Sequence, residues 1–173
     1  VHRPYINING KDCINPYNNL SYFEDIISSI SDVKTYNIIH GDCTFSNTLV
    51  DDSGNVWLID PRGTFGSTKI YGDKRYDWAK FYYSASGNYD SINSKQFKVS
   101  VISDYVNLEI KSNGYEVMSD YIISRSGMSK KEMLLINATI WLSLTGYVKE
   151  DIDAAMYAFY KGCELWTEAF SQT

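Results

Sequence analysis

Three polar residues, whose side chains could bind a metal ion or take part in catalysis, stand at the ends of short apolar runs within residues 36–63. Asp42 follows the first run, Asn47 begins the second, and Asp60 ends the third. Mg²⁺ takes one or two carboxylates together with phosphate oxygens and water. If these side chains converge, their two carboxylates and amide oxygen can hold Mg²⁺ beside a phosphate-bearing ligand.

A predicted β-hairpin brings two of the three together. Residues 48–50 and 56–59 are β-prone apolar runs, and the residues between them are the Asp, Ser, Gly and Asn of a tight turn. Asn47 and Asp60 then lie at the same open end of the hairpin. Asp42 lies on the preceding loop, five residues before Asn47, and can reach the same space.

One motif joins these residues: His-Gly-Asp at 40–42, Asn47 after four further residues, and a strand that ends in Asp60. It resembles the catalytic loop and metal-binding aspartate of the aminoglycoside phosphotransferase and choline kinase families. These are relatives of protein kinases, which carry H-R-D-x-x-x-x-N and D-F-G. Residues 72–80 resemble the helix start that follows in the small-molecule kinases. The bacterial lipopolysaccharide and capsule members are the subgroup that this region resembles.

The resemblance assigns a role to each residue of the cluster. Asp42 is expected to be the catalytic base that orients a substrate hydroxyl. Asn47 and Asp60 are expected to bind Mg²⁺ next to the phosphates of ATP, so Mg²⁺ and ATP are the implied cofactors. Taken singly, Asp42 would be explained as a turn cap and Asn47 as a turn residue. It is their combination with Asp60 that favours metal chemistry.

Five further residues are candidates for support or contact. His40 is expected to be a buried imidazole that bonds backbone near the metal site, and Asp77, by the resemblance, to accept N–H groups of the catalytic loop. Arg62, Asp73 and Arg75 are candidate contacts to phosphate or substrate. A helix cap for Asp73 and ordinary salt bridges for both arginines are the alternatives.

The whole chain is expected to form an α+β, mostly helical fold in a single domain, residues 1–173. Apolar periodicity and alternation predict the order helix 20–33, hairpin 48–59, helix 74–84, hairpin 96–110, and helices 114–126, 133–144 and 148–170. Residues 1–19 show no such pattern and are predicted to form a loop or entry segment, and residues 86–94 are predicted to break the helix that ends at 84. Ser129 and Glu132 have the spacing of a capping box ahead of the helix at 133.

Three packing expectations follow from these patterns. The helix at 20–33 is expected to pack its apolar face on the first hairpin. Val117, Tyr121 and Ile122 are expected to face inward from their helix. The last helix carries an apolar stripe between residues 148 and 170, which predicts a core-packing face.

By the resemblance, this domain corresponds to the carboxyl-terminal lobe of the protein-kinase-like fold, with the amino-terminal nucleotide lobe absent. No Gly-rich phosphate loop and no lysine-bearing V-A-I-K-like strand precede residue 36. That lobe is therefore expected in a longer chain of which this is a piece, or in a partner chain, or to have been lost together with activity.

The leading hypothesis is an ATP- and Mg²⁺-dependent phosphotransferase. It would act on a hydroxyl of a small molecule, such as a sugar or a choline-like alcohol, in bacterial capsule or lipopolysaccharide biosynthesis. The alternative is a non-catalytic, kinase-like binding or regulatory module that lacks the nucleotide lobe. A third hypothesis, a metal-dependent phosphohydrolase, calls for more ligands than two histidines supply.

The amino-acid composition limits the classes of partner that the protein is expected to bind. A formal net charge of −5 and the lack of a Lys/Arg-rich run argue against nucleic acid and a polybasic membrane anchor. Three cysteines far apart support neither a disulfide framework nor a zinc site. No run of about eighteen apolar residues occurs. A cytoplasmic protein is expected, whose partners are a nucleotide and a small-molecule acceptor.

Overall fold

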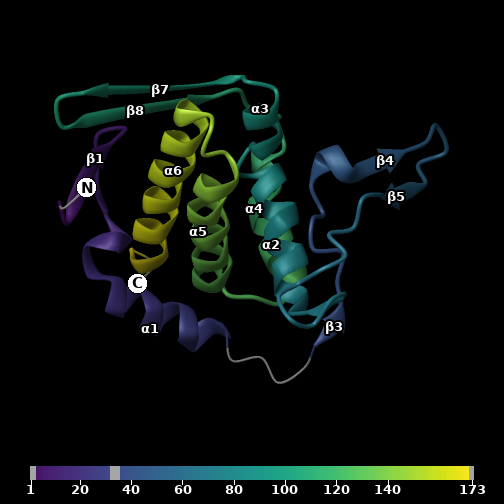
Figure 1. Ribbon diagram of the computed structural model, residues 1–173. Coiled ribbons are helices and arrows are strands. Elements are labelled where there is room, and N and C mark those ends of the chain that lie inside the picture. The colour runs from purple at the N-terminus through teal and green to yellow at the C-terminus, as the bar shows by residue number, and fades with distance from the viewer. Residues whose placement is uncertain (1–2, 32–35, 172–173) are drawn as a thin grey trace. The chain divides into compact units, whose positions relative to one another are not determined.

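The computed structural model describes residues 3–31 and 36–171, and it is an α+β fold in which helix predominates, as the sequence predicts (Figure 1). The described residues cluster into two compact units. The sheet unit comprises residues 3–31, 96–111 and 129–171, and the loop unit comprises residues 36–95 and 112–128. The expectation of a single domain stays a prediction.

The sheet unit contains a four-stranded sheet in the order β2-β1-β8-β7. Its strands are β1 (Tyr5–Ile8), β2 (Lys11–Ile14), β7 (Phe97–Ile102) and β8 (Tyr105–Ile110). β7 and β8 form the second predicted hairpin, with Phe97 opposite Ile110 and Ile102 opposite Tyr105. β1 pairs antiparallel with β2 and parallel with β8, so the sheet joins segments far apart in the sequence.

The prediction that residues 1–19 form a loop is wrong for the part described. They hold the β1–β2 hairpin and a 3₁₀ helix at Pro16–Asn19. Asn9 and Gly10 make the turn with φ of 50° and 81°, a conformation that Asn and Gly tolerate best. Ile8 and Cys13 are buried. An Asn-Gly pair after alternating isoleucines was the sequence feature that could have revealed this hairpin.

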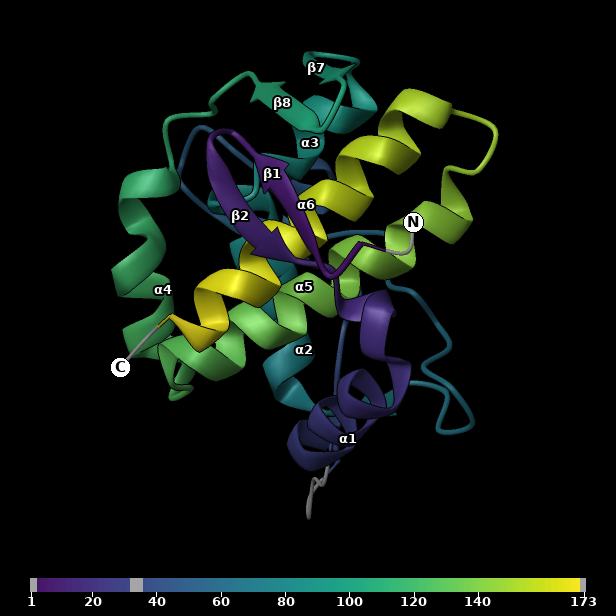
Figure 2. The ribbon, with the colours of Figure 1, turned by 90° about the vertical axis from the view of Figure 1, so that its left-hand side faces the viewer.

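Two long helices, α5 (Lys130–Tyr147) and α6 (Ile152–Phe170), pack against each other in the sheet unit. The predicted capping box at Ser129 and Glu132 opens α5, and the buried side chains of this helix include Leu134, Leu135, Ala138, Trp141 and Leu142. β1 and β2 cross over α6 (Figure 2), and the N–H of Ile14 donates to Thr167 Oγ1 at 2.7 Å.

The predictions for the first and last helices are only partly confirmed. The α6 stripe includes buried Cys163 and Trp166, but Ile152 is 71% exposed because the buried face is centred on other residues, such as Ala158. Helix α1 (Leu20–Ser31) is confirmed over the described residues, while the predicted end at residue 33 lies outside them. It packs on α6, since the Phe23 ring lies 4.9 Å from that of Trp166. The hairpin belongs to the loop unit, so the expected packing of this helix on it stays a prediction.

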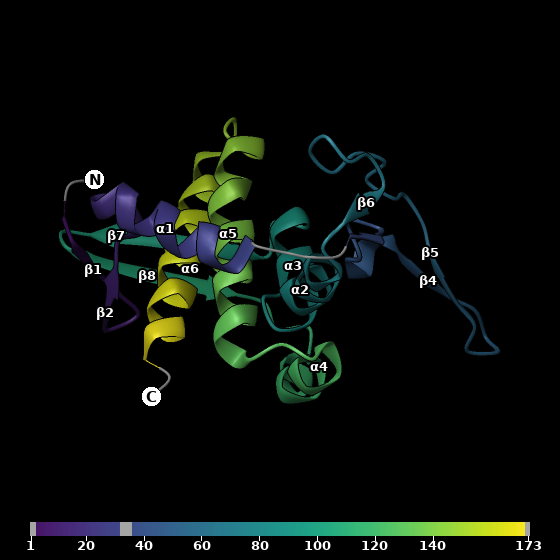
Figure 3. The ribbon, with the colours of Figure 1, turned by 90° about the horizontal axis from the view of Figure 1, so that it is seen from below.

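The loop unit is built from short strands and three helices. These are β3 (Asn37–Ile38), β4 (Thr48–Val50), β5 (Val56–Leu58), β6 (Tyr71–Gly72), α2 (Lys74–Ala85), α3 (Tyr89–Asn93) and α4 (Ser119–Ser126). The predicted first hairpin is confirmed as β4–β5, and β3 pairs with β6. The hairpin extends away from α2 (Figure 3). The apolar residues of the two strands are 50–65% exposed, so the hairpin contributes little to a hydrophobic core.

Two predictions in the loop unit need correction. Residues 86–94 break the helix as predicted, since α2 ends at Ala85, but they also hold α3, which follows Asn88 with its left-handed φ of 56°. The helix predicted at 114–126 is a 3₁₀ turn, Glu116–Met118, followed by α4. Ile122 is buried as predicted, but Val117 is 85% exposed and Tyr121 is exposed, because the 3₁₀ turn breaks the helical phase. None of the helices in the described ranges is long and apolar enough to cross a membrane.

Two glycines in α5 and α6 give a matched stability test. A Cβ on Gly162 would lie 2.6 Å from Leu142 Cγ, whereas one on Gly146 would meet nothing within 4 Å. We expect Gly162→Ala to lower the free energy of unfolding by about 1–3 kcal/mol through overpacking. Gly146→Ala should raise it by up to about 1 kcal/mol through helix propensity. Urea denaturation measures both, and equal effects would contradict the packing described.

Candidate functional site

The loop of residues 40–42 is held to helix α2 by one carboxylate. Asp77 Oδ2 accepts the N–H of His40 at 2.8 Å, and Asp77 Oδ1 accepts the N–H of Gly41 at 2.7 Å. Hydrogen bonds to an ionised acceptor are stronger than those between neutral groups. Asp77 therefore fixes the backbone that carries Asp42.

Gly41 is required for this backbone path on two counts. Its φ is 79°, in the left-handed region, and an added Cβ would lie 2.9 Å from Arg62 Cβ. Arg62 comes this close because its N–H donates to the His40 carbonyl at 2.9 Å. The loop and the segment after β5 are thus joined main chain to main chain.

The His40 imidazole links the same two segments. Its Nδ1 accepts the N–H of Asp42 at 3.3 Å, and its Nε2 lies 3.0 Å from the carbonyl oxygen of Ile59. Both contacts are satisfied when Nε2 carries the proton and donates to Ile59. The imidazole thus makes the predicted bond to backbone and positions the loop, but it is half-buried and not buried as predicted.

The carboxylate of Asp42 contacts a different partner at each oxygen. Lys80 Nζ lies 2.8 Å from Oδ1, and Asn47 Nδ2 donates to Oδ2 at 2.8 Å and to the Asp42 main-chain oxygen at 3.0 Å. The sequence interpretation missed Lys80. The available clue was its spacing, since residues three apart in a helix, such as Asp77 and Lys80, share a face.

Lys80 is unusually buried for a lysine, with 9% of its surface exposed. Its Nζ lies 4.7 Å from the ring centre of Tyr83 and 5.4 Å from that of Tyr89. Burial raises the pKa of both tyrosines, of Tyr83 strongly, so their rings stay uncharged. Neutral aromatic faces attract an ammonium, and Asp42 supplies the opposite charge.

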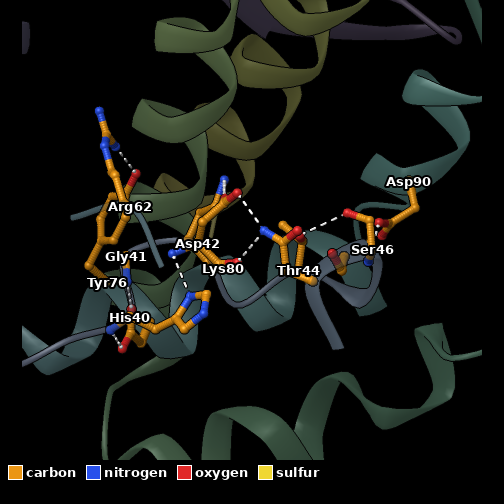
Figure 4. Close-up of polar contacts among 12 residues, drawn as sticks. His40, Gly41, Asp42, Thr44, Ser46, Arg62, Tyr76, Lys80 and Asp90 are labelled. Atoms are coloured by element: carbon orange, nitrogen blue, oxygen red, sulfur yellow. Dashed lines mark hydrogen bonds and ion pairs between the residues drawn. The ribbon is translucent and has the colours of Figure 1, made fainter. Parts of the chain in front are cut away.

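The loop residues after Asp42 are tied to α2 and α3. Thr44 donates its N–H to the Asp42 carbonyl at 2.8 Å, and Phe45 donates its N–H to Ser84 Oγ at 3.1 Å. The N–H of Ser46 donates to Asp90 Oδ1 at 3.0 Å (Figure 4). Side chains of α2 and α3 thus hold the main chain of Phe45 and Ser46.

The hairpin brings Asn47 and Asp60 to the same end, as its predicted register requires. The N–H of Ile59 donates to the Asn47 carbonyl at 2.9 Å, and Asp60 follows with a left-handed φ of 59°. Asp60 is exposed. Within the described ranges no three His, Cys, Asp or Glu residues form a metal-binding group. A cation here would take one amide oxygen and one carboxylate, and such a donor set fits Mg²⁺ completed by phosphate and water.

The three remaining candidates are engaged with neighbouring residues. Asp73 caps α2, with Oδ1 accepting the N–H of Arg75 at 2.9 Å, and its Oδ2 pairs with Arg75 Nε at 2.7 Å. Arg62 Nη1 donates to the hydroxyl of Tyr76 at 3.2 Å. These contacts match the helix-cap and salt-bridge alternatives for Asp73 and Arg75.

Comparison with known proteins gives one similarity. The family model described as Seadornavirus VP7 matches residues 11–83, which is less than half of the chain. No curated protein and no solved structure matches significantly. The matched range includes β4–β5 and most of α2, so the similarity covers Asp42, Asn47, Asp60 and Lys80 but not Ser84, Tyr89 and Asp90.

This similarity overturns the family assignment made from the motif. The match is to a viral family and not to the aminoglycoside phosphotransferase or choline kinase families, so that identification is wrong. The function it implied, a bacterial small-molecule kinase of capsule or lipopolysaccharide biosynthesis, is therefore wrong as well. The motif covers few residues, and a short motif fixes local geometry without fixing the family.

The contacts of Asp77 generate a stability prediction. In Asp77→Asn one acceptor oxygen becomes an NH₂ group facing a donor, so we expect unfolding to become easier by about 1.5–3 kcal/mol. Hydrogen exchange at the amides of His40 and Gly41 should accelerate at the same time. Urea denaturation and exchange measured by NMR test this. Asp52→Asn, in the exposed hairpin turn, is the control, and it should stay within about 0.5 kcal/mol of wild type.

Cys43 generates a pH prediction. Burial, and next the negative charge of Asp77, raise the pKa of its thiol from 9.0 to about 12. Only the thiolate is nucleophilic, so alkylation by iodoacetamide in the folded protein should stay slow up to pH 10. The unfolded thiol ionises first, so the free energy of unfolding falls as pH rises from 9.0 toward 12. Peptide mass spectrometry measures the alkylation, and a rate inflection near pH 8.5 would contradict the shift.

Proposed function

We propose that the loop unit binds Mg²⁺ together with the phosphate groups of a nucleotide such as ATP. The observation that carries this proposal is the orientation of Asn47. Its Nδ2 donates to Oδ2 and to the main-chain oxygen of Asp42, at 2.8 and 3.0 Å, so Oδ1 is the atom left for a ligand. Asp60 supplies the carboxylate, because it directly follows Ile59, whose N–H donates to the Asn47 carbonyl.

The charges at the site are suited to a Mg²⁺ ion that is bound both by the protein and by a phosphate group. Lys80 lies 2.8 Å from the Asp42 carboxylate, so Asp60 is the acid that provides charge for a cation. Mg²⁺ held by one carboxylate and one amide oxygen keeps most of its coordination positions and a net positive charge. Phosphate oxygens are suited to fill those positions. The name of the Seadornavirus VP7 family specifies no ligand, so the proposal rests on the loop geometry alone.

Several expectations from the sequence stay predictions beside this proposal. A carboxyl-terminal lobe of the protein-kinase-like fold is one, and the way Asp77 accepts two loop N–H groups supports it. The second expectation is that Asp42 acts as an enzymatic base, and the third is a cytoplasmic location. The fourth is a nucleotide lobe supplied by a longer or partner chain, which would add contacts to the base and sugar of the nucleotide.

The proposal predicts binding that depends on Asp60. Isothermal titration calorimetry with MgCl₂ and with Mg·ATP should detect binding by the wild-type chain. Asp60→Asn should weaken the affinity for Mg·ATP at least about tenfold, because it removes the charge of a ligand. Asn keeps the size of Asp and tolerates a left-handed φ, so the hairpin end is preserved. Asp52→Asn removes the same charge from the hairpin turn and should leave the affinity unchanged.

Two outcomes would refute the proposal. One is the lack of both heat and chemical-shift change at the Asn47 side chain when Mg·ATP reaches millimolar concentration. The other is equal weakening by Asp60→Asn and Asp52→Asn, which would mean that the cation is attracted by the acidic surface in general. Tripolyphosphate in place of ATP separates recognition of phosphate from recognition of the base.

A further inference from the structure

Asp42 is the only residue of the sequence-predicted cluster whose charge has a buried counter-charge among the described residues. Lys80 Nζ lies 2.8 Å from Asp42 Oδ1, with 11% of the lysine side chain and 38% of the aspartate side chain exposed. The second oxygen, Oδ2, accepts a hydrogen bond from Asn47 at 2.8 Å. The carboxylate is therefore held at both oxygens by partners from two different elements.

Lys80 has little freedom to leave this position. Its side chain is packed with the rings of Tyr83 and Tyr89, at 4.7 and 5.4 Å from Nζ to the ring centres. Asp90 and Asp77 are the other acids close to this region, but they accept main-chain N–H groups of Ser46 and of His40 and Gly41. A buried ammonium needs a counter-charge, and Asp42 provides it.

We infer that Lys80 is a positioning residue that keeps the Asp42 carboxylate from binding the cation, so that Asp42 and the cation ligands have separate roles. This inference rests on the proposed function. An ammonium in contact with Oδ1 cancels the charge that Asp42 would offer to Mg²⁺, and it repels a cation at that oxygen. Mg²⁺ is left to Asn47 and Asp60. Asp42 keeps a fixed carboxylate that can accept a hydrogen bond from a hydroxyl group or a water molecule next to the phosphate.

A purely structural role for Lys80 would have different consequences. Such a lysine would affect the stability of the loop unit when replaced, without changing which residues bind the cation. The Asn47 side-chain amide reports whether Lys80 holds Asp42, because its protons donate to Asp42, and the Mg²⁺ affinities of the variants separate the two roles. Exchange of these protons with solvent can be measured without any metal.

The first experiment compares Lys80→Met with Lys80→Arg in the metal-free chain. We expect the Asn47 side-chain amide protons to exchange at least about tenfold faster in Lys80→Met, because the Asp42 carboxylate is no longer held. Lys80→Arg keeps the charge and should stay near the wild-type rate. Buried Asn137, whose Nδ2 donates to the Met133 carbonyl at 3.1 Å in the sheet unit, is the internal control. An unchanged Asn47 rate in Lys80→Met overturns the inference.

If Lys80→Met does not fold, the side-chain NMR signal of Lys80 in the wild-type chain tests the inference instead. An ammonium held by Asp42 should give a slowly exchanging ¹⁵N side-chain signal that moves in Asp42→Asn. A rapidly exchanging signal that Asp42→Asn leaves unchanged overturns the inference.

The second experiment measures Mg²⁺ affinity in Lys80→Met and in a double variant. The double variant Asp42→Asn/Lys80→Met removes the ion pair as a unit and should leave the affinity within about twofold of wild type, because Asp42 is not a ligand, whereas Lys80→Met alone should increase the affinity about tenfold by exposing the Asp42 charge. A tenfold loss in the double variant overturns the separation of roles between Asp42 and the cation ligands. Absence of any Mg²⁺ response in every variant refutes the proposed function, while the metal-free exchange rates still decide the role of Lys80.

Discussion

The two hydrogen bonds that Asp77 accepts from consecutive main-chain N–H groups are the contacts on which the loop depends. At 2.8 and 2.7 Å they fix the main-chain N–H groups of His40 and Gly41. With those N–H groups fixed, the left-handed turn at Gly41 directs the next residue toward α2. A buried donor without an acceptor is costly, so the loop has one favourable path.

Helix α2 serves as the platform for the whole loop. Asp77, Lys80 and Ser84 are spaced by three and four residues, which places them on one helical face, and each contacts a successive part of the loop. Asp77 holds its start, Lys80 holds Asp42, and Ser84 accepts the N–H of Phe45. A rigid helix thus sets the spacing between loop residues. This is why a set of residues on an irregular segment can keep a defined geometry.

The similarity to a viral family and the resemblance to small-molecule kinases concern overlapping residues but have different scope. The motif at 40–47 specifies a turn, an acid and an amide, and these follow from local steric and hydrogen-bonding demands. The family match extends over residues 11–83 and includes the β2 strand and helix α1, which the motif does not describe. A short chemical motif is therefore evidence about geometry, and a longer match is evidence about relationship.

The sequence by itself determined the elements whose rules are local: the β4–β5 hairpin from its turn residues, the start of α5 from the Ser129–Glu132 box, and the shared hairpin end of Asn47 and Asp60. Tertiary structure decided the rest. The parallel pairing of β1 with β8 and the packing of Phe23 on Trp166 join segments far apart in the chain. So does the approach of Lys80 to Asp42. Turn chemistry and periodicity act within a few residues, whereas these contacts depend on which distant surfaces meet when the chain becomes compact.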